Sequence, residues 1–333
     1  MTELLCLALA LLAQPAQEGT PSPAAAAKPT VDEQVAAEAA AIRDALEAWC
    51  AAQSGLARHD ALDGRLTVWS DFAAADARDA VKRTAGVLAR LDRAFGAPAD
   101  PAAARIEGLM IEDAGRYRSL CDALAEVAPT QRDFLRASKA GAGFTLYAPP
   151  LTAYYHDAAV QKEAKADHSV AHSFVHLELW RRFGALPLWL TEGLACAGED
   201  GAWGEVWAYW YREGFVAAKS HAEWRGKRTQ ELVAGLGDLR RLFAYGARPF
   251  EEENALLAFA FATYGLDAEP ANFAVFTAAL REAYQRHHPE GGRPVLPPEQ
   301  VEAMLADSFG ADFLGRFQAW WKKPPRWNAK RPR

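Results

Sequence analysis

The sequence is poor in cysteine, with four in 333 residues, and no two of them have the spacing C-x-x-C. That spacing is typical of structural zinc sites and of redox-active thiol pairs, so neither kind of site is indicated. Three cysteines remain after the N-terminal leader described below: Cys50, Cys121 and Cys196. An odd number indicates no disulfide framework, although one bridge between two of them is possible.

Two common catalytic motifs and an excess of positive charge are also missing. The chain has no glycine-rich loop of the phosphate-binding kind and no G-x-S-x-G nucleophile elbow. Its net charge is -6, and six basic residues after Trp321 contribute +6, which leaves -12 for residues 1–321. We therefore expect no binding of nucleic acid and interpret the basic tail, 323–333, as a solvated C-terminus.

Long hydrophobic runs are absent beyond the first residues, so we expect no transmembrane segment. Residues 4–13 form an apolar run of ten, which is too short to span a bilayer but suits the core of a signal peptide. We predict a signal peptide over 1–16, a low-complexity linker over 17–30, and export to the periplasm or outside the cell. The alternative is a disordered apolar tail.

The remaining pattern predicts an α+β domain over 31–322, with an α/β half (31–157) followed by a helical half (158–322). Alternation and flanking turn residues predict strands at 65–72 and 105–113, and one or two more within 143–157. Helical periodicity predicts the helices listed here: 31–53, 77–95, 115–126, 160–182, 189–199, 202–219, 228–235, 252–264, 271–287, 297–307 and 310–322.

The segment "VAHSFVHLELW" places His172 and His176 four residues apart within an apolar helix. Residues i and i+4 share one face of a helix, so the two imidazoles can converge on one zinc ion. Glu192 falls in the first turn of the next helix and can supply a third ligand, which gives the three-ligand arrangement of an open zinc site. The alternative for the histidines is a buried, hydrogen-bonded pair without a metal.

The segment "VAHSFVHLELWRRFGALPLWLTEGLACAGED" resembles the core of the gluzincin metallopeptidases, in particular the peptidase MA-like (DUF1570-like) group. The pattern of that group is H-E-x-x-H, a short loop, and L-P-x-W-L-x-E-G-x-A. The sequence has these matching residues: His172, His176, Leu186, Pro187, Trp189, Leu190, Glu192, Gly193 and Ala195. The likeness covers roughly residues 60–322 and implies a zincin-like fold, a short mixed sheet packed on the metal-site helix. It also implies that His172, His176 and Glu192 bind Zn²⁺.

The sequence departs from the family at Ser173, where the resemblance implies the general-base glutamate. A serine hydroxyl is so weak an acid that its basic form, the alkoxide, is hardly populated near neutral pH without an activating partner. The loss of general acid–base help costs roughly 10²–10⁴-fold in rate. Glu178 lies about 200° around the helix from His176 and should point away. His168 is one turn before His172, and we expect it to lie next to the ligands or to serve as an alternative ligand. In some gluzincins a tyrosine stabilises an oxyanion, and Tyr264 is the candidate here.

These observations predict a zinc metallopeptidase homologue that is catalytically impaired, a pseudopeptidase whose cleft binds a peptide or protein ligand. One alternative is an active zinc hydrolase that uses a metal-bound hydroxide and a different base. Another is a scaffold that binds peptide or glycan without a metal. The edge strand of the cleft is predicted within "GAGFTLYAPP".

Overall fold

The computed structural model describes residues 30–101, 103–155, 166–207, 224–244, 252–287 and 296–323. The predicted signal peptide, nearly all of the linker and nearly all of the basic tail lie outside these residues. The described helices are α1 (Val31–Ala52), α2 (Ala74–Phe95), α3 (Ala114–Val127), α4 (Arg132–Ser138), α5 (Ala166–Phe183), α6 (Leu188–Trp203), α7 (Lys227–Ala234), α8 (Arg240–Phe243), α9 (Glu252–Asp267), α10 (Pro270–His287), α11 (Pro298–Phe309) and α12 (Phe313–Lys322). The described strands are β1 (Ala57–Ala61), β2 (Leu66–Ser70), β3 (Ile106–Ile111), β4 (Gly143–Tyr147) and β5 (Pro150–Tyr155). The protein is therefore α+β, as the sequence predicts.

The five strands form one small mixed sheet in the order β1-β2-β3-β5-β4. The three central strands, β2, β3 and β5, are parallel, and β1 and β4 pair antiparallel with them at the two edges. Every residue of β3 is buried, as expected for a central strand covered on both faces. The segment predicted to be an edge strand is β4, which is an edge of this sheet.

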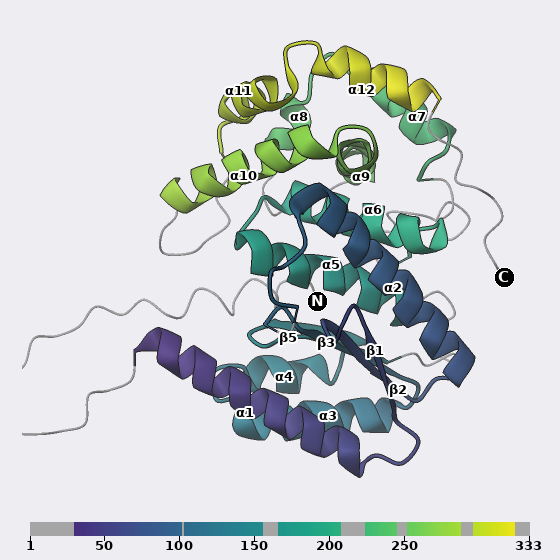
Figure 1. The fold of residues 1–333 in the computed structure, drawn as a ribbon, viewed down its shortest axis with the longest axis vertical. Helices are drawn as coiled ribbons and strands as arrows, with labels where there is room; N and C mark the ends of the chain where they lie inside the picture. The colour runs from purple at the N-terminus through teal and green to yellow at the C-terminus, as the bar shows by residue number, and fades with distance from the viewer. Residues whose placement is uncertain are drawn as a thin grey trace, which may run out of the picture.

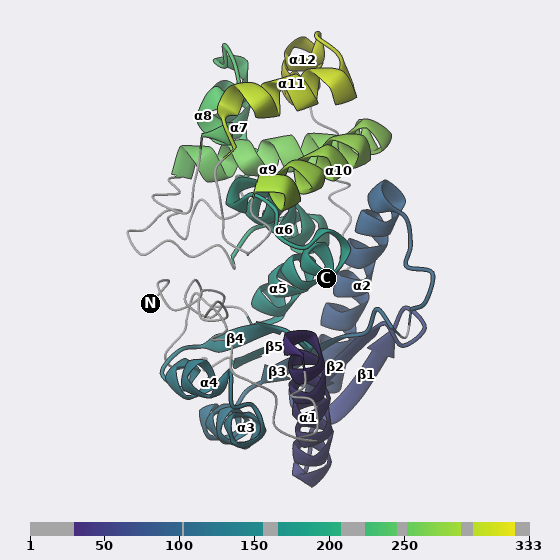
Figure 2. The same cartoon turned by 90° about the vertical axis from the view of Figure 1, so that its left-hand side faces the viewer.

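Helices cover both faces of the sheet (Figures 1 and 2). α1, α3 and α4 lie on one face, and α2 and α5 lie on the other. α6 packs on α5, and α9 packs on α6, so the helical half extends away from the sheet. Each side has its own buried apolar cluster, one beneath α1 and α3 and a larger one around α2, α5, α6 and α9.

α5 lies directly on the middle of the sheet because β3 carries a glycine where the helix approaches. A β-carbon at Gly108 would lie 2.4 Å from the ring of Phe174, closer than any real contact. The absence of a side chain at Gly108 lets the ring of Phe174 reach the backbone of β3. This contact positions the helix that carries His172 and His176.

The structure corrects several element boundaries. α6 continues to Trp203 without a break at residue 200, so the predicted boundary between helices 189–199 and 202–219 is wrong; residues 208–219 lie outside the described part. β1, α4 and α8 were not predicted. The first residues of the helix predicted at 160–182 also lie outside the described part. Among the described helices, none has the length and apolar character needed to cross a membrane.

Candidate metal centre

A short turn brings two helices together at the histidine pair. α5 ends at Phe183, and Gly184 follows with φ 67°, a left-handed conformation that favours glycine. Its N–H donates to the carbonyl of Trp180 at 2.7 Å, which closes the end of the helix. Pro187 precedes α6, which begins at Leu188, so Glu192 lies in the second turn of that helix and not, as predicted, in the first turn. The turn thus places the carboxylate of Glu192 opposite the histidines of α5.

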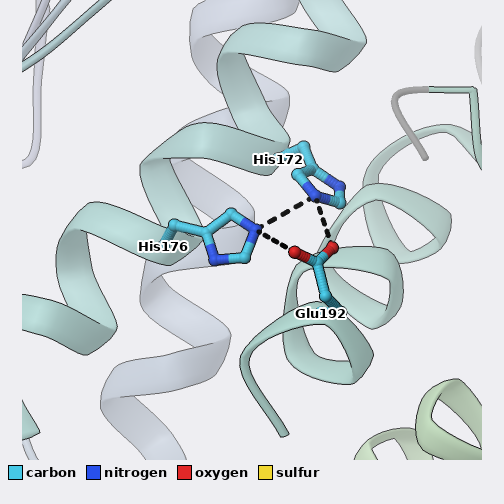
Figure 3. A group of neighbouring side chains, drawn as sticks. All are labelled: His172, His176 and Glu192. Carbon is cyan, nitrogen blue, oxygen red and sulfur yellow. Dashed lines mark hydrogen bonds and ion pairs between the residues drawn. The ribbon is translucent and has the colours of Figure 1, made fainter. Parts of the chain in front are cut away.

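The side chains of His172, His176 and Glu192 converge on one point (Figure 3). The two Nε2 atoms are 3.1 Å apart. Glu192 Oε2 lies 3.4 Å from His172 Nε2, and Glu192 Oε1 lies 3.5 Å from His176 Nε2. Ligand atoms held at about 2.0–2.1 Å around a tetrahedral zinc ion lie roughly 3.3 Å from one another. The spacing therefore fits one metal ion between the three side chains.

Among the residues that the structure describes, these three form the group able to hold a metal ion. Their side chains are 10%, 17% and 20% exposed in chain order, so the centre is mostly buried. Burial alone would favour neutral Glu192, but the charge of His176 and hydrogen bonds from both histidines outweigh it and lower its pKa well below the usual range. Glu192 is thus held as a carboxylate, the form that binds a metal.

Glu199 of α6 contacts the other side of His172. This residue is fully buried and was not predicted as part of the site. Its Oε2 lies 3.4 Å from His172 Nδ1, and its Oε1 lies 2.7 Å from His168 Nδ1. A carboxylate at Nδ1 keeps the proton on that nitrogen and leaves Nε2 free to bind a metal. Burial raises the pKa of Glu199, but the two histidines outweigh this effect and lower it to about 2.

His168 belongs to the surroundings of the centre. It is buried, its Nδ1 is engaged by Glu199, and its ring packs against Trp203 with centroids 4.4 Å apart. Of the two roles expected for His168, the structure favours that of a residue next to the ligands. The Glu199 carboxylate that it contacts also approaches His172.

Position 173 faces a tyrosine. Ser173 is 5% exposed, and its Oγ lies 3.0 Å from the hydroxyl oxygen of Tyr154 on β5. Tyr154 was not predicted as part of the site, because its approach to α5 depends on the register of the sheet. Position 173, where the resemblance places a general base, therefore carries a serine hydroxyl that contacts a tyrosine hydroxyl.

Glu178 points away from the centre, as predicted. Its buried carboxylate pairs at 2.6 Å with Arg65, the residue before β2, and it also pairs with Arg181 and Arg182 of its own helix. Arg65 and Arg182 also pair with Asp92 of α2. Glu178 thus joins α5 to the segment before β2 and, through Arg65 and Arg182, to α2, and it cannot serve as a substitute base.

The structure does not bring Tyr264 to the centre. Its ring packs edge-on against Phe313 and Phe317 of α12, and its hydroxyl donates to Glu269. Both contacts occupy the side chain within the helical half. The geometry does not support the oxyanion role suggested for Tyr264.

The centre thus joins the predicted ligands, His172, His176 and Glu192, and adds Glu199 and Tyr154. Glu199 has a signal in the sequence, because it follows Glu192 by seven residues, two turns along one helical face.

A scan of protein-family models finds no match to the chain, and a search of curated proteins finds no significant match.

Proposed function

We propose that the protein is a zincin-like, gluzincin-type zinc protein related to the peptidase MA-like group that has lost the catalytic base, and hence a pseudopeptidase. The observation that carries the proposal is the convergence of His172, His176 and Glu192 at distances suited to zinc. Zinc would act as a Lewis acid toward an oxygen of the bound ligand. The mixed sheet packed on α5 and the helices that follow are in keeping with a zincin-like fold.

The residues around the centre favour binding over cleavage. The hydroxyl pair of Ser173 and Tyr154 replaces a carboxylate, and Glu178 is held by three arginines. Without a carboxylate at position 173, the rate of hydrolysis should be lower by roughly 10²–10⁴-fold.

The edge strand β4 offers a place for an extended peptide. Tyr147 at its end packs against Trp180, with ring centroids 4.9 Å apart. Trp180 is one turn beyond His176 on the same face of α5. β4 therefore lies on the side of the metal centre, and its outer edge, which no described strand pairs with, offers a place to add one strand of a bound peptide.

Metal analysis of the protein purified without added zinc tests the first part of the proposal. We expect about one zinc ion per chain in the wild type and a large loss in His172→Ala. Ser173→Ala serves as the control, because it changes the same helix without removing a ligand, and it should keep the metal. Absence of metal from the wild type, even after incubation with zinc, would favour the scaffold without a metal.

Restoring the carboxylate tests the second part. Tyr154 lies within reach of a carboxylate at position 173, so Ser173→Glu is made both alone and with Tyr154→Phe, which frees the glutamate from the tyrosine. We expect cleavage of a casein or peptide-library substrate to appear in at least one of these variants. Ser173→Gln, with the same shape and no base, should remain inactive. Strong wild-type cleavage that His172→Ala abolishes would contradict the proposal and favour an active hydrolase.

A further inference from the structure

The hydroxyl pair at position 173 occupies a defined place beside the metal centre. Ser173 is three residues before His176, a spacing at which β-carbons on a helix lie about 5–6 Å apart. The Tyr154 oxygen, 3.0 Å from Ser173 Oγ, lies within the reach that a glutamate side chain at this position would have. A tyrosine hydroxyl from the sheet thus lies close to where the family pattern places a carboxylate.

The sheet holds this tyrosine in position. Tyr154 of β5 pairs with Gly143 of β4, and a β-carbon at Gly143 would lie 2.1 Å from the Tyr154 ring. The ring therefore lies flat on the backbone of the edge strand, in space that only a glycine leaves open. The position of the hydroxyl thus depends on Gly143 as well as on Ser173.

The pair differs chemically from a carboxylate. A carboxylate at neutral pH only accepts hydrogen bonds, whereas each hydroxyl carries one hydrogen. The bond between Tyr154 and Ser173 uses one of these two hydrogens, and within the described part of the chain neither hydroxyl makes a second hydrogen bond. One O–H group therefore remains to donate to a ligand. A glutamate at position 173 would carry a negative charge that repels an anion, and the hydroxyl pair carries no such charge.

We propose that Tyr154 and Ser173 make the metal centre a receptor for a carboxylate, such as the C-terminus of a peptide. This inference rests on the proposed metal site. The hydroxyl pair would donate a hydrogen bond to one oxygen of that carboxylate, and the metal held by His172, His176 and Glu192 would attract the other. A hydroxyl at this place can donate a hydrogen bond to an anion, whereas a carboxylate at this place would accept a proton from water.

The test uses the protein loaded with Co²⁺, whose visible absorption reports changes in the ligands of the metal, unlike that of zinc. The probes are N-acetyl-leucine, a carboxylate, and N-acetyl-leucinamide, its neutral counterpart. We expect a saturable spectral change with the acid and at least about tenfold weaker binding of the amide. Tyr154→Phe should weaken binding of the acid about tenfold, because a hydrogen bond to a charged group is lost. Gly143→Ala, which displaces the ring, should have a similar effect.

Tyr155→Phe is the matched control. Tyr155 is the next residue on β5 and faces the opposite side of the sheet, where its ring packs against Tyr117 at 5.0 Å. It should bind the acid as the wild type does. Equal binding of acid and amide, or unchanged binding of the acid in Tyr154→Phe, would overturn the inference while the Co²⁺ spectrum still supported the metal site. Failure of the wild type to take up Co²⁺ would overturn both.

Discussion

His172 lies between two carboxylates, and this position determines its protonation. Glu192 and Glu199 each approach one of its ring nitrogens at 3.4 Å. Burial lowers the pKa of His172, but the hydrogen bonds and charges of the two glutamates outweigh it and raise the pKa to about 9. The metal-free protein therefore holds a proton on His172 at neutral pH, and a metal ion must displace it.

This proton makes zinc binding dependent on pH. The pKa of His172 in the folded protein lies above its ordinary value of 6.5, so protonated His172 stabilises the metal-free fold at low pH. This stabilisation is lost as the pH rises through about 9 and the proton leaves. Since binding displaces that proton, apparent zinc affinity should rise about tenfold per pH unit for each displaced proton between about pH 7 and pH 9. Competition with a chelator of known affinity at several pH values measures this slope.

Glu199→Gln separates the two roles of Glu199. The variant removes a charge that raises the pKa of His172, so the rise in affinity with pH should level off at a lower pH than in the wild type. At about pH 9, where protons compete less, affinity should still be about 10–100-fold weaker because the imidazole has lost its carboxylate partner. A variant with the same slope and affinity as the wild type would exclude this role for Glu199.

Single residues of the centre differ in how far the sequence predicts them. The four-residue spacing of His172 and His176 predicts their common face, and Glu192 follows from its place in the next helix. Glu199 stands beside Asp200 and reads as the polar end of a helix, but both are buried and paired, Glu199 with His168 and Asp200 with Arg225. Tyr154 has no local signal, because only the assembled sheet brings it to Ser173.

At the scale of elements, α6 connects the metal centre to the helical half. Glu192 faces α5, and the next residue, Gly193, lies against the backbone of α9. A β-carbon at Gly193 would lie 2.4 Å from the carbonyl oxygen of Ala258, which cannot move as a side chain can. The glycine thus allows the two helices to approach closely, and the same contact fixes the turn of helix that presents Glu192.

Gly193→Ala should therefore weaken both the fold and the centre. We expect a loss of about 1–3 kcal/mol in the free energy of unfolding, measured with urea, because the added methyl separates α6 from α9. Zinc affinity should fall as well, since Glu192 shifts with the helix. Gly86→Ala in α2 is the matched control, because no atom lies within 4 Å of its added β-carbon. It should stabilise the protein by roughly 0.5–1 kcal/mol and leave zinc affinity unchanged. Equal stability of the two variants would contradict the close approach of α6 and α9.

The elements that the sequence did not predict lack an apolar period. β1 reads "ARHDA", and its residues are exposed or half-buried, so the strand exists because it pairs with β2. α4 and α8 are short and bury few residues. The predicted break in α6 at residue 200 fails because Asp200 pairs with Arg225 inside the protein. For β1 and for the end of α6 the partner lies elsewhere in the sequence, and a local pattern does not contain it.

At the scale of the whole molecule, the triad joins the layers of the fold. α5 lies on the sheet, and α6 begins the stack of helices above it (Figure 1). The α+β class follows from the order of strands and helices in the sequence, while the zincin-like assignment remains a prediction. A metal ion bound by His172 and His176 of α5 and Glu192 of α6 would link these layers, so its effect should extend to the stability of the molecule.

Metal removal should therefore lower the melting temperature. An ion that binds only the folded protein adds about 2.7 kcal/mol when its concentration is roughly a hundredfold above Kd, and such a gain raises the melting temperature by about 5–10 °C in a domain of this order of size. We expect that shift between chelator-treated and zinc-loaded wild type in differential scanning calorimetry. His176→Ala should melt at the same temperature with and without zinc. His59→Ala, on the edge strand opposite β4, removes a histidine away from the triad and should keep the full shift. If His176→Ala also kept it, the stabilising ion would bind elsewhere, and the triad would lose its role in linking α5 to α6.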